Sequence, residues 1–267
     1  MKQRLSADRA GAMNDFCSAA ALVTGGGTGI GRATALALVR EGVRSITISY
    51  VTSAAGAEKT AKDLEALGAT VLVVQADVRS TGNITTMFDL AANTFGRLDI
   101  LINNAGTTRY VDLKDLDGLT DEIWDLTLDT NLRGIFRCCR TAAPVLKKSG
   151  GSIVNVASIA GLRGVGSSIA YSVSKAGVIQ LTRVLAVALA PEVRVNCVLP
   201  GMVLTNWIER GGGRVSTGEE ASRVAAATPL GKVALAEDVA DVIVGLVRSK
   251  LITGEEIVID GGKSLTY

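Results

Sequence analysis

The sequence predicts a single-domain α/β protein with a doubly wound, seven-stranded parallel sheet and helices on both faces. From Ala19 onward, short β-branched runs alternate with longer helical stretches, the rhythm of βαβ units. Apolar residues make up 48% of the 267 residues and aromatic residues only 4%, a small aliphatic mixture typical of strands buried on both faces. A glycine-rich turn joins the first strand directly to the first helix, as in dinucleotide-binding folds.

The predicted strands share short runs of Val, Ile, Leu and Thr, bounded by turn residues. They are residues 20–24, 45–50, 70–75, 100–103, 151–156, 194–199 and 256–259. The predicted helices lie between them, and several end near Gly or Pro: residues 31–41, 55–67, 84–95, 121–146 and 171–189. Each connection between parallel strands is expected to be right-handed.

Three segments define the expected domain organisation. Residues 1–18 are polar, rich in Ala and Gly, and lack the apolar segment of a signal peptide, so we expect a flexible leader. Residues 19–267 form the domain, because no linker composition divides them. Residues 202–229 interrupt the strand and helix rhythm with three consecutive glycines and a tryptophan, which favours a mobile lid over a pocket.

Composition excludes several classes of protein. The 28 basic and 26 acidic residues are dispersed, which favours a small-molecule partner over nucleic acid. The chain has no uninterrupted apolar run of about twenty residues, so we expect no membrane span. The four cysteines have no CxxC spacing, so we expect neither a metal nor disulfides, and a cytoplasmic location. The chain has no histidine, which removes His-based hydrolysis and His-ligated metals.

The glycine-rich turn at residues 24–31 reads TGGGTGIG. Glycines let the backbone approach a pyrophosphate closely, and the following helix offers free N–H groups at its positive end. The turn lacks the Lys-Ser/Thr ending of a P-loop, which disfavours a nucleoside triphosphate. The candidate phosphate-binding residues are Gly25, Gly27, Thr28, Gly29, Ile30 and Gly31.

The end of the second strand predicts the preference between the two nicotinamide dinucleotides. An acidic residue there accepts from the adenosine ribose 2′-hydroxyl and repels a 2′-phosphate. This chain has Tyr50, Thr52 and Ser53 in that region and no Asp or Glu. We therefore expect NADP(H) to be favoured over NAD(H), with the hydroxyl groups and nearby N–H groups holding the phosphate.

Tyr171 and Lys175 are four residues apart at the start of a long apolar helix, and Ser158 follows a strand. Residues at this spacing share one helix face, so the Lys175 ammonium, together with the positive nicotinamide ring, is expected to lower the pKa of the Tyr171 phenol from its ordinary value of about 10. Tyr171 would then serve as general acid or base in a chain without histidine. Ser158 would hydrogen-bond the substrate oxygen, although a serine at a strand end is also a common cap.

Together, these motifs resemble the short-chain dehydrogenase/reductase family, and most closely its 3-oxoacyl-acyl-carrier-protein reductase-like members. The likeness extends over residues 19–262 and rests on TGGGTGIG at 24–31, NNAG at 103–106, Asn131, Ser158, YSVSK at 171–175 and PG at 200–201. It implies a Rossmann fold, a homo-oligomer, usually a tetramer, and a catalytic tetrad of Asn131, Ser158, Tyr171 and Lys175. In this family the asparagine orders a water that links the lysine to solvent.

The resemblance also implies further cofactor contacts. Asp77 and Val78 would contact the adenine, and Tyr171 and Lys175 the nicotinamide ribose. Further residues would line the cofactor or lie near its carboxamide: Asn103, Ala105, Gly106, Pro200, Gly201, Val203 and Thr205. The chain departs from many NADPH-using relatives at Thr28, where they carry Arg or Lys.

The predicted function is hydride transfer between NADP(H) and a carbonyl or secondary alcohol, with a ketone or 3-oxoacyl compound as substrate. Three alternatives remain open at this point: an NAD(H)-dependent alcohol or sugar dehydrogenase, a non-catalytic dinucleotide sensor, and an S-adenosylmethionine methyltransferase. A sensor would typically lose the tyrosine or the lysine. A methyltransferase would share the glycine-rich turn but would explain neither YSVSK nor the ribose region.

Overall fold

The computed structural model describes residues 16–205, 207, 211–212 and 217–266. Within these residues, seven parallel strands form one sheet in the order β3-β2-β1-β4-β5-β6-β7. The strands are β1 (Ala20–Val23), β2 (Ser45–Tyr50), β3 (Thr70–Gln75), β4 (Ile100–Asn103), β5 (Ser152–Val156), β6 (Arg194–Pro200) and β7 (Glu256–Ile259). All seven predicted strands are confirmed, with each end within one residue.

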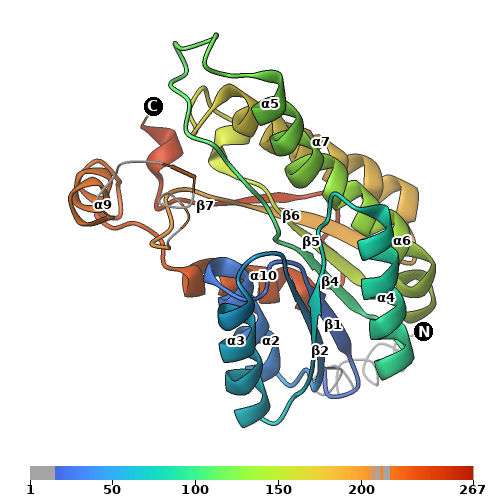
Figure 1. The fold of residues 1–267 in the computed structure, drawn as a ribbon. Coiled ribbons are helices and arrows are strands. Elements are labelled where there is room, and N and C mark those ends of the chain that lie inside the picture. The colour runs from blue at the N-terminus through green and yellow to red at the C-terminus, as the bar shows by residue number, and fades with distance from the viewer. Residues whose placement is uncertain (1–15, 206, 208–210, 213–216, 267) are drawn as a thin grey trace, which may run out of the picture.

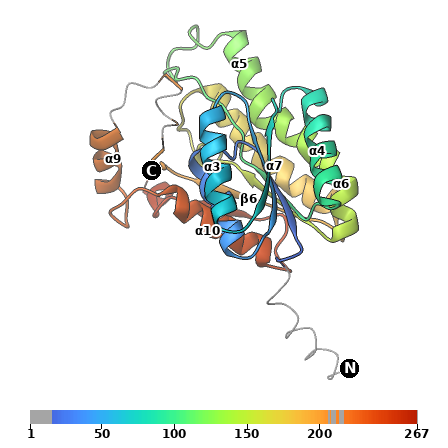
Figure 2. The same cartoon turned by 60° about the horizontal axis from the view of Figure 1, so that its bottom comes forward.

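Helices cover both faces of the sheet, as Figures 1 and 2 show. One face packs against α2 (Gly29–Arg40), α3 (Ala54–Ala66) and α10 (Ala236–Arg248). The other packs against α4 (Thr81–Phe95), α6 (Gly134–Ser149) and α7 (Ile169–Leu189). Each face is lined by buried Val, Ile, Leu and Ala side chains, which explains why the strands read as continuous apolar runs. The predicted doubly wound Rossmann class is confirmed.

The strand order reverses between β1 and β4. The chain leaves β1, builds β2 and β3 on one side, and returns to place β4 on the other side of β1. In open α/β sheets, the crevice at the carboxyl ends of strands beside such a reversal is where ligands bind. The glycine-rich turn after β1 and the NNAG turn after β4 meet at this edge.

The predicted helix at 121–146 is wrong as a continuous element. It divides into α5 (Asp121–Leu128), a π-helical turn at Asp129–Arg133, and α6. At the centre of the π turn, the Asn131 side chain bonds both backbone groups of Thr107, whose position in the chain is distant. A π turn inserts a residue into the helix, and here it turns this asparagine toward the loop after β4.

Two helices were not predicted. In α10, the Asp238 carboxylate accepts from Leu235 N at 2.7 Å and caps the helix, a signal present in the sequence. The helix α9 (Thr217–Ala226) lies inside the expected lid and stands apart from the sheet in both views (Figures 1 and 2). The predicted leader lies largely outside the described residues; residues 16–18 form a turn before β1.

By length and composition, α7 is the one helix among the described residues that could cross a membrane. In the fold, however, it packs against the sheet through Val178, Ile179 and Ala186. Core helices of globular proteins pass the same test of length and hydropathy, so this finding does not indicate a membrane protein.

Candidate active site

The glycine-rich turn forms the cradle that its sequence predicts. Gly25 and Gly29 adopt positive φ angles of 65° and 54°, a region that favours glycine. A Cβ on Gly31 would lie 2.4 Å from the carbonyl oxygen of Gly25, so no side chain fits there. A Cβ on Gly27 would lie 3.0 Å from Ala57 N at the start of α3. Because no side chain fits at these positions, the turn exposes backbone groups, which a pyrophosphate can approach closely.

Asn104, which the sequence analysis did not single out, holds this cradle to the next strand. Its Nδ2 donates to the carbonyl oxygens of Thr24 and Gly25 at 2.9 and 3.1 Å. In return, Thr24 Oγ1 accepts from the backbone N–H groups of Asn104 and Ala105, both at 3.0 Å. The second asparagine of the NNAG motif is therefore a positioning residue, and only the motif itself could have indicated it.

Asn104→Ala is expected to raise the Kd of the dinucleotide about fivefold, because the turn loses the donor for two carbonyl groups. Fluorescence titration with NADPH would measure the change. Asn93→Ala, on the exposed side of α4, is the matched control and should bind as the unmodified protein does. An unchanged Kd in Asn104→Ala would show that the turn holds its shape without this side chain.

Three residues predicted to contact the cofactor have side chains that are engaged elsewhere, so their predicted contacts would come from the backbone. The Asn103 side chain is buried and donates to Asn155 Oδ1 at 2.9 Å and to Cys139 Sγ at 3.2 Å, so only its backbone faces the crevice edge. The Val78 side chain is buried in the core against Gly134. The Ile30 side chain packs with α10 residues on the opposite side of the turn.

Asp77 lies in the loop between β3 and α4 and forms an ion pair with Arg79. Its carboxylate accepts from the Arg79 guanidinium at 2.6 Å, and this interaction lowers the carboxyl pKa. Asn83 Oδ1 accepts from Asp77 N at 3.2 Å. Any adenine contact of Asp77 would therefore share a carboxylate that already pairs with a cation.

The end of β2 leads into the N-terminus of α3. Tyr50 is partly buried, Thr52 is exposed, and Ser53 is the N-cap residue of α3 without a cap hydrogen bond from its side chain. A Cβ on Gly56 would lie 2.5 Å from Ser53 Oγ and 2.9 Å from Gly27 O, so the cap lies directly beside the glycine-rich turn. The Ser53 hydroxyl and the N-terminus of α3 therefore lie beside the glycine-rich turn.

The structure brings Ser158, Tyr171 and Lys175 together. Ser158 follows β5, and its hydroxyl lies close enough to the Tyr171 phenol to lower the pKa of that phenol. Lys175 Nζ lies 5.6 Å from the centre of the Tyr171 ring and donates to Val156 O at 2.8 Å. A Cβ on Gly161 would lie 2.7 Å from backbone atoms of α7, so the turn after Ser158 packs directly on that helix.

Burial dominates the titration of both groups. It raises the pKa of the Tyr171 phenol to about 12 from an ordinary value of 10.0, although the Ser158 hydroxyl works in the opposite direction. It lowers the pKa of Lys175 to about 8 from 10.5. Without a bound dinucleotide, burial therefore keeps the Tyr171 phenol protonated near neutral pH. The expected lowering with the positive nicotinamide ring bound stays a prediction.

Asn131, the remaining member of the predicted tetrad, is fully buried and lies behind the tyrosine. Its Oδ1 accepts from Thr107 N at 2.7 Å, and its Nδ2 donates to Thr107 O at 2.9 Å and Ser174 Oγ at 3.1 Å. Ser174 Oγ in turn donates to Tyr171 O at 2.7 Å. The Asn131 side chain thus couples the loop after β4 to the first turn of α7, and Ser174 is a link that the sequence analysis passed over.

The segment after β6 closes the remaining side. Pro200 O accepts from Ser158 Oγ at 3.4 Å, and Gly201 N donates to Ile259 O at 2.9 Å. Val203 pairs with Ala234 and packs toward α10. The Thr205 side chain lies against Gly29, where a Cβ would meet its methyl group at 3.4 Å. Pro200 therefore lies beside Ser158, and Thr205 lies beside the glycine-rich turn.

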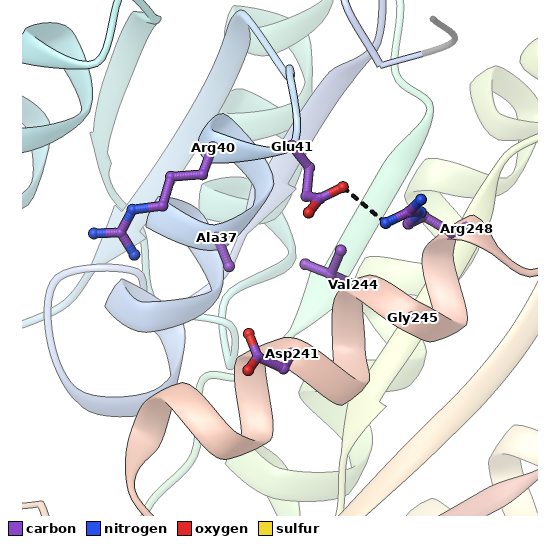
Figure 3. Close-up of a pocket in the computed structure, with 7 residues that line it drawn as sticks. All are labelled: Ala37, Arg40, Glu41, Asp241, Val244, Gly245 and Arg248. Carbon is purple, nitrogen blue, oxygen red and sulfur yellow. Dashed lines mark hydrogen bonds and ion pairs between the residues drawn. The ribbon is translucent and has the colours of Figure 1, made fainter. Parts of the chain in front are cut away.

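A hollow of about 300 Å³ lies elsewhere, between α2 and α10 (Figure 3). Its lining includes the ion pair between Glu41 and Arg248, 3.0 Å apart, together with Arg40 and Asp241. These helices cover the sheet face opposite α7. The hollow therefore has no access to the Tyr171 phenol and is not part of the site.

The fold and this geometry define a class: an oxidoreductase that uses a nicotinamide dinucleotide. Residues 25–264 match the family model described as enoyl-(acyl carrier protein) reductase. The chain belongs to the short-chain dehydrogenase/reductase family, which confirms the resemblance.

Individual relatives agree with this assignment. The chain is 41% identical over 246 residues to the protein named ketoacyl reductase 2 of the granaticin polyketide synthase of Streptomyces violaceoruber, over 92% of this chain and 96% of that one. It is 34% identical over 246 residues to the 3-oxoacyl-acyl-carrier-protein reductase FabG of Staphylococcus aureus, over 91% and 96%. The crystal structure of levodione reductase superposes with a TM-score of 0.87 at 30% identity, over 94% and 100%.

Proposed function

We propose that the protein is an NADP(H)-dependent reductase of ketones or 3-oxoacyl compounds, with Tyr171 as the general acid. The observation that carries this proposal is the cluster of Ser158, Tyr171 and Lys175 beside the glycine-rich turn. The names of the relatives, a ketoacyl reductase and a 3-oxoacyl reductase, support the substrate class. By the same resemblance, we propose a cytoplasmic homo-oligomer, a dimer or a tetramer, of one domain.

The bound dinucleotide would supply the hydride that reduces the carbonyl carbon. Ser158 Oγ would donate to the carbonyl oxygen and orient it, which stabilises the negative charge that develops there. Tyr171 Oη would then transfer its proton to that oxygen. A buried phenol with a raised pKa remains protonated near neutral pH, so it is ready to act as an acid in the reductive direction.

Lys175 would stabilise the tyrosinate that proton transfer leaves behind. Its ammonium lies over the same ring and is the cation nearest to it in the site described above. Asn131 would act indirectly, because its side chain bonds Thr107 and Ser174 and so fixes the position of the first turn of α7. We propose the same catalytic set that the family resemblance implies, with Asn131 as a positioning residue.

The start of α3 supports the preference for NADP(H). Ser53 is the N-cap residue of α3, but its hydroxyl makes no capping hydrogen bond to the helix backbone. Thr52 beside it is exposed. Anions are stabilised at helix N-termini by the free N–H groups and the helix dipole. A 2′-phosphate would find both there and would meet no carboxylate at the end of β2.

Thr52→Asp and Ser53→Asp are each expected to shift the preference between NADPH and NADH at least about tenfold toward NADH, because a carboxylate repels the 2′-phosphate and accepts from a 2′-hydroxyl. The ratio of the two Kd values would measure the shift. Thr52→Asn and Ser53→Asn, which add similar bulk without charge, are the controls. If both Asp variants keep the original ratio, the 2′-phosphate site lies elsewhere.

The proposed function is tested first by titrating the purified protein with NADPH and NADH, followed by initial rates at 340 nm. The substrate panel contains simple ketones, 3-oxoacyl thioesters, and, in the oxidative direction, alcohols and sugars. Turnover of a ketone or 3-oxoacyl thioester with NADPH is the expected result. Turnover of sugars or alcohols with NAD⁺ alone would favour the dehydrogenase alternative, and tight binding without any turnover would favour a sensor.

A further inference from the structure

The indole of Trp207 reaches from the segment after β6 to the catalytic tyrosine. The centres of the Trp207 and Tyr171 rings are 6.4 Å apart, and the ring planes meet at 53°. This distance lies within the range at which aromatic rings attract each other. Because the rings are tilted and not stacked, the indole face and the phenol form two sides of a corner.

Backbone hydrogen bonds hold this corner in place. Trp207 N donates to Thr205 Oγ1 at 3.4 Å, and Gly211 N donates to Trp207 O at 3.2 Å. Gly211 O in turn accepts from Tyr110 N at 3.0 Å, which ties the segment to the loop after β4. These bonds connect the backbone of Trp207 to the segment after β6 and to the loop after β4.

Two glycines bring backbone close to the two rings. A Cβ on Gly106 would lie 3.3 Å from Trp207 Cη2 and equally close to Asn131 Oδ1, so the indole edge rests on backbone. On the other side, a Cβ on Gly166 would lie 3.6 Å from Tyr171 Cδ1. Walls of backbone and aromatic carbon fit a flat group better than a bulky one.

The surroundings of the phenol are largely shielded from solvent. Burial raises the pKa of Tyr171. Recognition of a sugar requires several convergent polar groups around the reacting carbon. Apart from Ser158 and Lys175, which serve the reacting carbonyl group, the described part of the site offers the Trp207 indole, the Tyr171 phenol and two glycines.

We propose that Trp207 determines substrate specificity: its indole holds a flat, apolar ring of the substrate while the attached carbonyl group faces Ser158 and Tyr171. This inference rests on the proposed reductase function and deepens it, because it names the substrate class. The favoured substrates are ketones that carry an aromatic ring a short chain away from the carbonyl.

A matched pair of ketones tests the proposal with the full-length protein and NADPH. 4-Phenyl-2-butanone and 4-cyclohexyl-2-butanone have the same chain and differ in whether the six-membered ring is flat. We expect kcat/KM to favour the phenyl ketone about fivefold, since aromatic pairing contributes a modest additional attraction. Trp207→Leu should bring this ratio near one, and Trp207→Phe should keep most of it.

A second measurement is independent of turnover. The chain has two tryptophans, so Trp124→Phe leaves Trp207 as the single tryptophan reporter. Circular dichroism would confirm that this variant folds. The phenyl ketone should quench the Trp207 emission saturably and at lower concentration than the cyclohexyl ketone.

The outcomes separate this inference from the proposed function. Turnover with an equal ratio in the unmodified protein, or a ratio that Trp207→Leu leaves unchanged, would overturn the role of Trp207 while the reductase function stands. Preferential quenching by the phenyl ketone without turnover of any ketone would support the Trp207 site and overturn the reductase function. The absence of both turnover and preferential quenching would overturn both.

Discussion

Tyr171→Phe is expected to lower kcat about 10²- to 10⁴-fold, the usual contribution of a positioned general acid. The phenyl ring keeps its contacts with Trp207 and α7, but the proton that the carbonyl oxygen requires is gone. The Kd of NADPH should change less than about threefold, because one hydroxyl among many contacts is lost. Initial rates at 340 nm and fluorescence titration on the same preparation measure both quantities.

Tyr110→Phe is the matched control for this prediction. Tyr110 also contributes a hydroxyl near the site, and its residue is 48% exposed. Its removal should leave kcat within about threefold, because Tyr110 is not assigned a proton to transfer. If Tyr171→Phe retained a kcat close to that of Tyr110→Phe, Tyr171 would not be the proton donor.

Lys175→Met is expected to abolish most turnover and yet stabilise the cofactor-free protein at pH 7. The residue is 4% exposed, and burial lowers its pKa to about 8, so the charged form is held against a desolvation penalty. Removing the charge should raise the free energy of unfolding by about 1–3 kcal/mol, partly offset by loss of the hydrogen bond to Val156 O. Urea unfolding would measure it. The exposed Lys147→Met is the control, expected to change stability within about 0.5 kcal/mol.

The stability difference between the unmodified protein and Lys175→Met should depend on pH. The pKa of Lys175 is about 8 in the folded protein, against an ordinary 10.5, so between these values the unfolded chain binds the proton more strongly. The contribution of Lys175 to the free energy of unfolding should therefore become less unfavourable as the pH rises from about 8 to 10, and the difference between the two proteins should narrow.

Tyr171 acts in the opposite direction, but only above about pH 10. Its pKa of about 12 in the folded protein lies above the ordinary 10.0, so the unfolded chain ionises first and stability falls there. Burial also raises the pKa of Cys138, Cys139 and Cys197. Tyr171 and these cysteines are present in both proteins, so the difference between the two proteins isolates the lysine. A stability difference that stays constant from about pH 8 to 10 would show that Lys175 is not held charged against desolvation.

Local sequence predicted most of the fold, for a physical reason. Strands buried on both faces need continuous β-branched runs, and each of the seven runs became a strand. The glycine-rich turn was also predictable, because positive φ angles at Gly25 and Gly29 and the close approach at Gly31 leave few other residues possible. Tyr171 and Lys175 share a helix face by their spacing alone.

Long-range contacts decided the features that the sequence analysis missed. The break in the helix at 121–146 depends on Asn131 bonding Thr107, and the burial of Asn103 depends on Asn155 of the neighbouring strand. Both partners are distant in the sequence, so the pattern of neighbouring residues does not predict these contacts. Periodicity of the surrounding residues favoured one continuous helix, and the NNAG motif did not indicate which asparagine faces the core.

By itself, the sequence determined the class of fold, the dinucleotide cradle and the identity of the residues that can carry a proton, because these follow from local backbone geometry and side-chain chemistry. The tertiary structure alone decided how those residues titrate and what surrounds them. Desolvation of Tyr171 and Lys175, and the approach of Trp207 to the phenol, arise only when separate segments close around one crevice.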